Sequence, residues 1–151
     1  MAKDKGFKID GMDDLVKMMN KLERVPQKVV TKAARAGATI PLKAARKNAP
    51  EDTGELKKGI VLKAERRTKI GKKVYDIMMD PAKNDLFVKY AKDGTRYYYP
   101  ASQEYGFMTE NGRYIPGYRY LRNAITNNVK AIEAKVVEVA GKEVMKVMRG
   151  G

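Results

Sequence analysis

The sequence predicts an α+β domain in which N-terminal helices and a long C-terminal helix pack on one antiparallel β-sheet. Apolar residues recur at helical spacing near both ends of the chain, whereas residues 60–65 show the alternation of a half-buried strand. Glycine and proline interrupt the region between these patterns. A chain of this length suits one domain, so we expect residues 1–151 to form it, with short flexible ends at about 1–9 and 149–151.

Two helices are expected at the start of this domain. The first covers residues 11–24, where apolar side chains follow a helical pattern. These side chains are Met12, Leu15, Val16, Met19 and Leu22. The second begins at Pro26 and runs to about Asn48. Pro41 lies inside it and should kink or divide the helix, because proline removes one helical hydrogen bond.

A short helix and a hairpin should follow. In the segment Asp-Thr-Gly-Glu, Asp52 is expected to cap the helix and Glu55 to complete a capping box. Alternating residues then predict a strand over 60–64, which a turn near 70–72 connects to a second strand at 74–79. Together these two strands would form a β-hairpin that ends before Pro81.

The rest of the sheet and the last helix complete the prediction. Residues 84–99 should form a strand pair that turns at Asp93-Gly94, a dipeptide typical of hairpins. A helical turn is expected over 100–105, followed by a loop or small hairpin over 106–117. One continuous helix should span 119–148. Its apolar stripe is Leu121, Ile125, Val129, Ile132, Val136, Ala140, Val144 and Val147.

The composition argues against catalysis. The chain has no Cys and no His, which removes thiolate nucleophiles, the commonest general base and the commonest metal ligands. A Mg²⁺-dependent nuclease would need clustered carboxylates. The candidate acids Asp76, Asp80, Asp85 and Asp93 are spaced so that they do not share one face. We therefore expect no enzyme, no cofactor and no metal site, and no membrane span, because no apolar run approaches about 20 residues.

A basic face on the second helix is the first candidate site. The net charge is +14, and most of the basic excess lies in the first half of the chain. The basic face consists of Lys28, Lys32, Arg35, Lys43 and Arg46. Such a face could contact nucleic-acid phosphates without reading sequence, contact an acidic neighbouring protein, or be solvated.

An aromatic and arginine-rich stretch is the second candidate site. Tyrosine and arginine are enriched at protein–protein interfaces, although aromatic side chains can also stack on bases or fill a core. We favour an oligomer interface or core positions over base stacking. The predicted interface residues are Tyr97, Tyr98, Tyr99, Tyr105, Phe107, Arg113 and Tyr114.

Three ordered motifs resemble those of a known family. The first, residues 49–60, reads Ala-Pro-Glu-Asp-Thr-Gly-Glu-Leu-Lys-Lys-Gly-Ile, and its motif residues are Pro50, Asp52, Thr53, Gly54 and Leu56. The second covers 99–106, with Phe107 where the family usually has Thr. The third covers 118–125, with Tyr120 in place of Phe. This ordered set resembles the tail-component family of long-tailed bacteriophages, which are called tail-completion, neck or head–tail joining proteins.

The resemblance implies a virion structural protein, made in the host bacterial cytoplasm and located at the head–tail junction. Its expected partners are further copies of itself in a closed, six-fold ring and the neighbouring neck, connector and tail-tube proteins. A basic nucleic-acid-binding protein that makes non-specific DNA contact is the alternative. Within the first motif, Gly54 would permit a tight turn into the helix and Leu56 would anchor that helix to the core.

Overall fold

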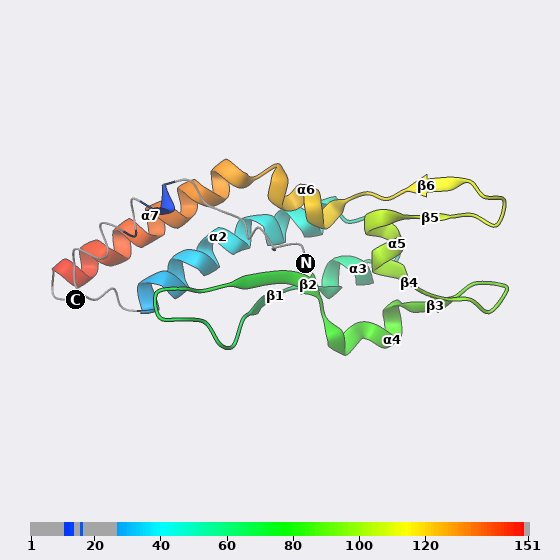
Figure 1. The fold of residues 1–151 in the computed structure, drawn as a ribbon, viewed down its shortest axis with the longest axis horizontal. Coiled ribbons are helices and arrows are strands. Elements are labelled where there is room, and N and C mark those ends of the chain that lie inside the picture. The colour runs from blue at the N-terminus through cyan, green and yellow to red at the C-terminus, as the bar shows by residue number, and fades with distance from the viewer. Residues whose placement is uncertain (1–10, 14–15, 17–26, 150–151) are drawn as a thin grey trace. The chain divides into compact units, whose positions relative to one another are not determined.

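The structure, a computed structural model, describes residues 11–13, 16 and 27–149 (Figure 1). It confirms the α+β class. The helices are α2 (Gln27–Asn48), α3 (Glu55–Gly59), α4 (Asn84–Phe87), α5 (Tyr99–Tyr105), α6 (Tyr120–Thr126), α7 (Val129–Met148) and the 3-10 helix η1 (Pro81–Lys83). The strands are β1 (Ile60–Ala64), β2 (Tyr75–Met79), β3 (Val88–Tyr90), β4 (Arg96–Tyr98), β5 (Gly106–Met108) and β6 (Tyr114–Pro116).

The chain divides into two compact units. The first contains Met1–Ile40, Ala64–Tyr75 and Val129–Gly151, and the second contains Pro41–Lys63 and Asp76–Asn128. The expected helix over 11–24 and the expected flexible ends lie largely outside the described residues. That the whole chain forms one domain stays a prediction.

The described strands form three two-stranded sheets, so the expectation of one sheet was wrong. The β3–β4 and β5–β6 pairs are antiparallel hairpins. Strands β3 to β6 are only three residues long, and helical segments separate successive hairpins. Each hairpin therefore pairs locally. Residues 84–87, expected as strand, form the helix α4. This helix follows η1 directly, and η1 starts at Pro81 and is capped by Asp80 at the Ala82 amide (3.0 Å).

The core of the first unit is the contact between α2 and α7. Val29 and Ala33 of α2 form a buried cluster with the α7 stripe, which confirms four stripe positions. These are Ile132, Val136, Ala140 and Val144. The two helices approach closely at Gly37, where an added methyl group would overlap the side chain of Val136. An ion pair of 2.7 Å between Lys32 and Glu143 joins the same helices at the edge of this contact.

The core of the second unit gathers α2, α3, β1 and α6. Its buried cluster is Ala45, Ala49, Leu56, Ile60, Tyr120 and Ala124. Helix α2 continues through Pro41 and is not divided there, because residues on both sides are held by buried contacts. Leu56 anchors α3 as expected. Phe87 packs against Gly59, which has no room for a side chain.

The predicted capping box at α3 was wrong. Gly54 occupies the N-cap position with φ +79°, in the left-handed region that glycine adopts readily, and Asp52 makes no cap hydrogen bond. The amide of Glu55 instead reaches the Thr53 hydroxyl (3.4 Å). The Glu55 carboxylate pairs with Lys58 and Lys83, whose hydrogen bonds lower its pKa.

The predicted helix over 119–148 is two helices. It is interrupted at Asn127-Asn128, where the Asn128 side chain donates to the carbonyl of Ala124 (2.8 Å) and so competes with helical bonding. The interruption separates the apolar stripe into two parts. In α6, Tyr120 and Ala124 are buried, whereas Ile125 is 37% exposed.

Candidate functional site

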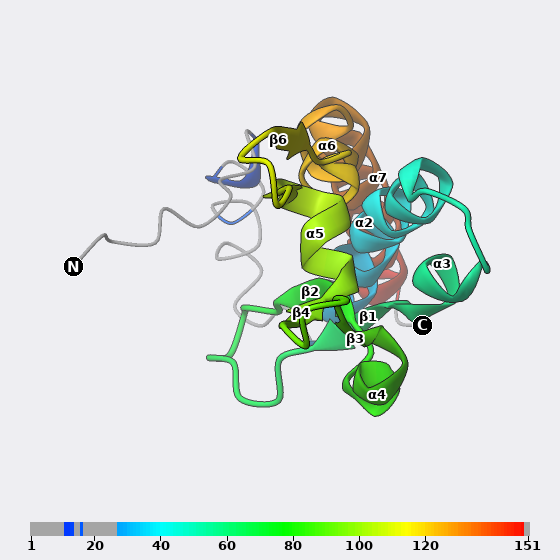
Figure 2. The same cartoon turned by 90° about the vertical axis from the view of Figure 1, so that its right-hand side faces the viewer.

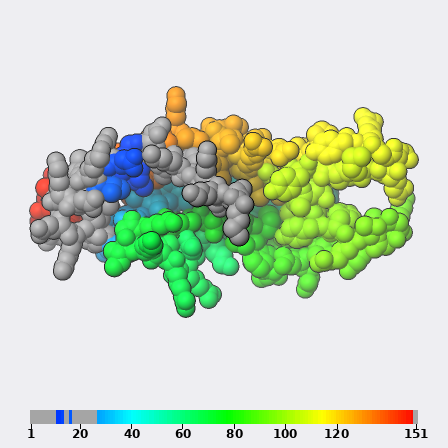
Figure 3. All heavy atoms as spheres, viewed as in Figure 1, coloured from blue at the N-terminus to red at the C-terminus, as the bar shows by residue number. Residues whose placement is uncertain are grey.

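The aromatic and arginine-rich stretch lies on the β3–β4 and β5–β6 hairpins and on α5, all in the second unit. Helix α5 lies between the two hairpins in both views (Figures 1 and 2). The space-filling view shows an opening between the outer parts of the two hairpins (Figure 3). We call the exposed side chains of these hairpins and of the ends of α5 the hairpin surface.

Five of the seven predicted interface residues lie on the hairpin surface. They are Tyr97, Tyr105, Phe107, Arg113 and Tyr114. The other two are half-buried: Tyr98 packs edge-on against Phe87, with ring centroids 6.2 Å apart, and Tyr99 packs on the core. Burial raises the pKa of both tyrosines, and the charge of Asp52 raises that of Tyr99 further. Tyr98 and Tyr99 therefore pack against buried residues and hold the exposed residues of the hairpin surface in place.

The hairpin surface also includes residues that the sequence prediction missed. Tyr90 is 68% exposed on β3 and Met108 is 63% exposed on β5. Tyr90 pairs with Arg96 across the hairpin, so the turn at Asp93-Gly94 could have indicated it. Arg119 lies 5.7 Å from the centre of the Tyr105 ring, a cation–π distance.

Glu104 fixes the base of the second hairpin, a role that sequence reasoning also missed. It is the buried charged residue of the described chain and is 4% exposed. Its carboxylate accepts hydrogen bonds from the backbone amides of Leu121 (2.9 Å) and Arg122 (3.1 Å). These amides lie in the first turn of α6, where N–H groups have no acceptor within the helix. The Glu104 carbonyl accepts from the Arg119 amide (3.1 Å). Glu104 thus connects α5 to α6 on either side of the hairpin.

The first family motif lines a pocket of about 250 Å³ in the second unit. Its lining residues are Asp52, Thr53, Gly54, Glu55, Leu56, Leu86, Phe87, Lys89 and Tyr99. Asp52 is exposed, and no lysine or arginine in the described part of the chain forms an ion pair with it. Leu86 is 52% exposed. The pocket therefore combines apolar side chains with the Asp52 carboxylate and the Lys89 ammonium group, neither of which forms an ion pair within the described residues, and we call it the motif pocket.

Two of the five residues of the predicted basic face bind other side chains or backbone groups of the same chain. All five of its residues are exposed on α2. However, Lys32 pairs with Glu143, and Arg46 donates through Nε (3.1 Å) and Nη2 (2.8 Å) to the carbonyl of Ile60. Lys28, Arg35 and Lys43 have no ion-pair partner within the described ranges.

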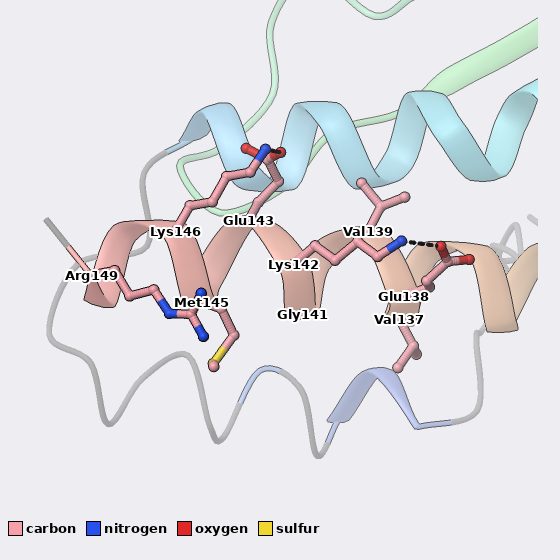
Figure 4. A pocket seen from close by; sticks show the side chains of 9 residues that line it. All are labelled: Val137, Glu138, Val139, Gly141, Lys142, Glu143, Met145, Lys146 and Arg149. Atoms are coloured by element: carbon pink, nitrogen blue, oxygen red, sulfur yellow. Dashed lines mark hydrogen bonds and ion pairs between the residues drawn. The ribbon is translucent and has the colours of Figure 1, made fainter. Parts of the chain in front are cut away.

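A second pocket, of about 710 Å³, lies along α7 in the first unit (Figure 4). Its lining residues are Val137, Glu138, Val139, Gly141, Lys142, Glu143, Met145, Lys146 and Arg149. Each of its acids is already paired with two lysines: Glu138 with Lys135 and Lys142, and Glu143 with Lys32 and Lys146. These hydrogen bonds lower the pKa of both carboxylates. Both acids in the described part of the lining are therefore held in ion pairs.

The described residues contain neither a metal site nor a membrane-spanning helix. No group of three or more acidic, His or Cys side chains is placed to hold a metal ion. None of the described helices is long and apolar enough to cross a membrane.

Comparison with known proteins identifies one family. A family model described as "Bacteriophage HK97-gp10, putative tail-component" matches residues 13–97, which is more than half of the chain. The match includes the first motif and the motif pocket up to Lys89, and it ends before Glu104 and the second hairpin. No curated protein and no solved structure matches the chain.

Proposed function

The chain belongs to the bacteriophage tail-component family of HK97 gp10, and from this premise we propose that it is a ring subunit at the head–tail junction that helps to join the tail to the head. Membership of this family makes it a structural component of the virion. The observation that carries the finer proposal is the hairpin surface. Its exposed Tyr, Phe, Met and Arg side chains are the types enriched at protein–protein interfaces.

A ring is the assembly that this surface supports best. We propose that a neighbouring subunit binds the hairpin surface through a different surface of its own. Such heterologous contacts generate closed rings when the rotation between subunits closes. We propose six subunits, as the family resemblance implies, with neck, connector and tail-tube proteins above and below the ring.

The net charge of +14 bears on when the ring forms. Like-charged subunits repel one another in solution, which opposes association of the isolated protein. Docking on an assembled tail or connector would offset this repulsion, because binding to a template stabilises the associated state. We therefore propose that the ring closes on its template during virion assembly.

Imaging of assembled particles tests the proposed position. In averaged electron micrographs of particles that contain the chain, we expect a ring of density for it between head and tail. Particles from which the chain is deleted should lack this ring and contain unjoined heads and tails. Density elsewhere in the particle, or density without ring symmetry, would contradict the proposal.

Duplex DNA binding distinguishes the alternative function. If the basic face contacted phosphates, reversing Lys28, Arg35 and Lys43 would reduce the slope of log affinity against log salt by about 3. A matched variant reverses the exposed residues Lys63, Lys92 and Lys130. We expect the two triple variants to have the same slope, because a diffuse basic charge attracts DNA without using a particular face. A smaller salt slope for the variant with Lys28, Arg35 and Lys43 reversed, and not for the matched variant, would favour the DNA-binding alternative.

A further inference from the structure

The loop that connects β1 to β2, in the first unit, is strongly basic. Residues 66–73 contain five basic side chains and no acidic one. All five except Lys73 are exposed, and none of them forms an ion pair within the described residues. The five are Arg66, Arg67, Lys69, Lys72 and Lys73. We call residues 66–73 the basic loop.

Hydrogen bonds hold the basic loop in one conformation beside the start of α2 (Figure 1). The side chain of Gln27 donates to the carbonyl of Lys72 (2.9 Å) and accepts from the amide of Gly71 (2.9 Å). Within the loop, the Lys72 amide donates to the Lys69 carbonyl (3.0 Å) and closes a tight turn, in which Gly71 has φ +83°. The surface of the loop is therefore formed before a partner binds, which lowers the entropy cost of binding.

Ile70 lies within this turn, between Lys69 and Gly71. It is 95% exposed, more than any other exposed large apolar residue of the described chain. Single exposed apolar residues are common on protein surfaces, so exposure alone does not indicate a contact. Here, however, the apolar side chain lies in a loop that is held in place, and cationic side chains flank it on both sides. An apolar centre with a charged rim is the arrangement of a protein–protein contact.

The chemistry of the basic loop distinguishes between possible partners. A nucleic-acid backbone would pair with the cations but would leave Ile70 in water, because phosphates offer no apolar contact. A lipid surface would accept both, but one apolar side chain anchors a protein only weakly. A protein surface can present an apolar socket and carboxylates together. The chain belongs to a family of phage tail components, so its neighbours are other virion proteins.

We propose that the basic loop docks on an acidic surface of a different virion protein, where Ile70 enters an apolar socket and Lys69 and Lys72 pair with carboxylates at its rim. A second copy of this chain suits the role less well, because it carries the same net charge of +14. The inference rests on family membership and is independent of the proposed ring and of its position in the particle.

Competition for places in the particle tests the docking site. Cells that assemble particles would produce equal amounts of the unmodified chain and one variant, and peptide mass spectrometry would give their ratio in purified particles. We expect Lys69→Glu combined with Lys72→Glu to be depleted about tenfold, because it places anions opposite the acidic surface. Ile70→Ser should be depleted several-fold, because it removes the apolar contact at the centre.

The matched controls change the same kinds of residue on α7 in the same unit. Lys130→Glu combined with Arg149→Glu gives the same net charge as the loop variant, and both positions are exposed. Val147→Ser replaces an apolar side chain that is 43% exposed. Both controls should enter particles as readily as the unmodified chain. Loop variants that are depleted no more than these controls would overturn the proposal.

A reagent that joins lysine amines directly to carboxylates identifies the class of partner. In purified particles, we expect Lys69 and Lys72 to be linked to Asp or Glu of another virion protein. Links only to further copies of this chain, or none at all, would overturn the proposal. With duplex DNA, the loop double variant and its α7 control should give the same salt slope. A slope smaller by about 2 for the loop variant alone would assign the site to nucleic acid instead.

Gln27→Ala tests whether the loop must be held in place, since it changes no charge. It removes both bonds to the loop, so amide exchange at Gly71 should accelerate and incorporation into particles should fall about threefold. Thr39→Ala is the control, because it removes a side-chain bond to the Arg35 carbonyl elsewhere on α2. Faster exchange at Gly71 with unchanged incorporation would overturn the role of the fixed conformation.

Discussion

Replacing Gly106 with alanine is expected to lower the free energy of unfolding by about 3 kcal/mol or more. Gly106 has φ +89° and ψ −177°, a conformation that is nearly exclusive to glycine. An added methyl group would also overlap the carbonyl oxygen of Ile115 and crowd the amide of Gly117. Both groups are backbone atoms of the opposite side of the hairpin, so neither can move without shifting the β5–β6 pair.

Gly112 provides a matched control in the same hairpin. It also has a positive φ, +74°, but an added methyl group there would meet no atom within 4 Å. Gly112→Ala should therefore lower the free energy of unfolding by only about 1 kcal/mol, the cost of a positive φ for a residue with a side chain. Chemical denaturation of the two variants would measure the difference. Equal losses would show that the close backbone contact at Gly106 does not contribute to stability.

The parts of the fold that were predictable from sequence depend on local chemistry. The hairpin turn at Asp93-Gly94 forms as expected, with the Asp93 side chain accepting from the Thr95 amide (2.9 Å). The second hairpin turns near Gly112, whose amide donates to the carbonyl of Thr109 (2.9 Å). Hairpin pairing is decided within about ten residues, so turn dipeptides suffice to indicate it. Whether separate hairpins join into one sheet depends on hydrogen bonds between distant strands, which no local pattern encodes.

The errors at helix ends have a related cause. The helical pattern of apolar residues continues through Asn127-Asn128, so periodicity alone predicted one helix over 119–148. The interruption depends on the side-chain bond from Asn128 to the backbone of Ala124. Two adjacent asparagines were the available signal, because their side chains compete with helical hydrogen bonds.

The candidate site was predictable in composition but not in exposure. The run Tyr97-Tyr98-Tyr99 crosses from β4 into α5, so the spacing of buried positions changes within three residues. Neither a strand pattern nor a helix pattern alone could therefore separate the exposed tyrosine from the two half-buried ones. The motif pocket could not be seen in the sequence either, because α4 and β3 bring Leu86 and Lys89 to it from 30 or more residues beyond Leu56.

Replacing Glu104 with alanine is expected to lower the free energy of unfolding by about 3 kcal/mol. The change removes the shared acceptor of the Leu121 and Arg122 amides and leaves two partly buried donors at the start of α6 unpaired. Hydrogen bonds to a charged group contribute about 1.5–3 kcal/mol each, and a cavity adds to the loss. Glu104→Gln keeps one oxygen acceptor but turns its carboxamide NH₂ group, a donor, towards the other backbone amide, so about half of the loss should remain.

Amide hydrogen exchange separates this capping role from a general loss of packing. If Glu104 holds the start of α6, Glu104→Ala should accelerate exchange at Leu121 and Arg122 more than at Val136 in the core of the first unit. Glu110→Ala, an exposed acid in the β5–β6 turn, is the matched control and should change stability by less than about 0.5 kcal/mol. If the two alanine variants were equally stable, the carboxylate would not be what connects α5 to α6. The backbone bonds from Tyr118 to Gln103 and from Arg119 to Glu104 would then hold the base of the hairpin without the carboxylate.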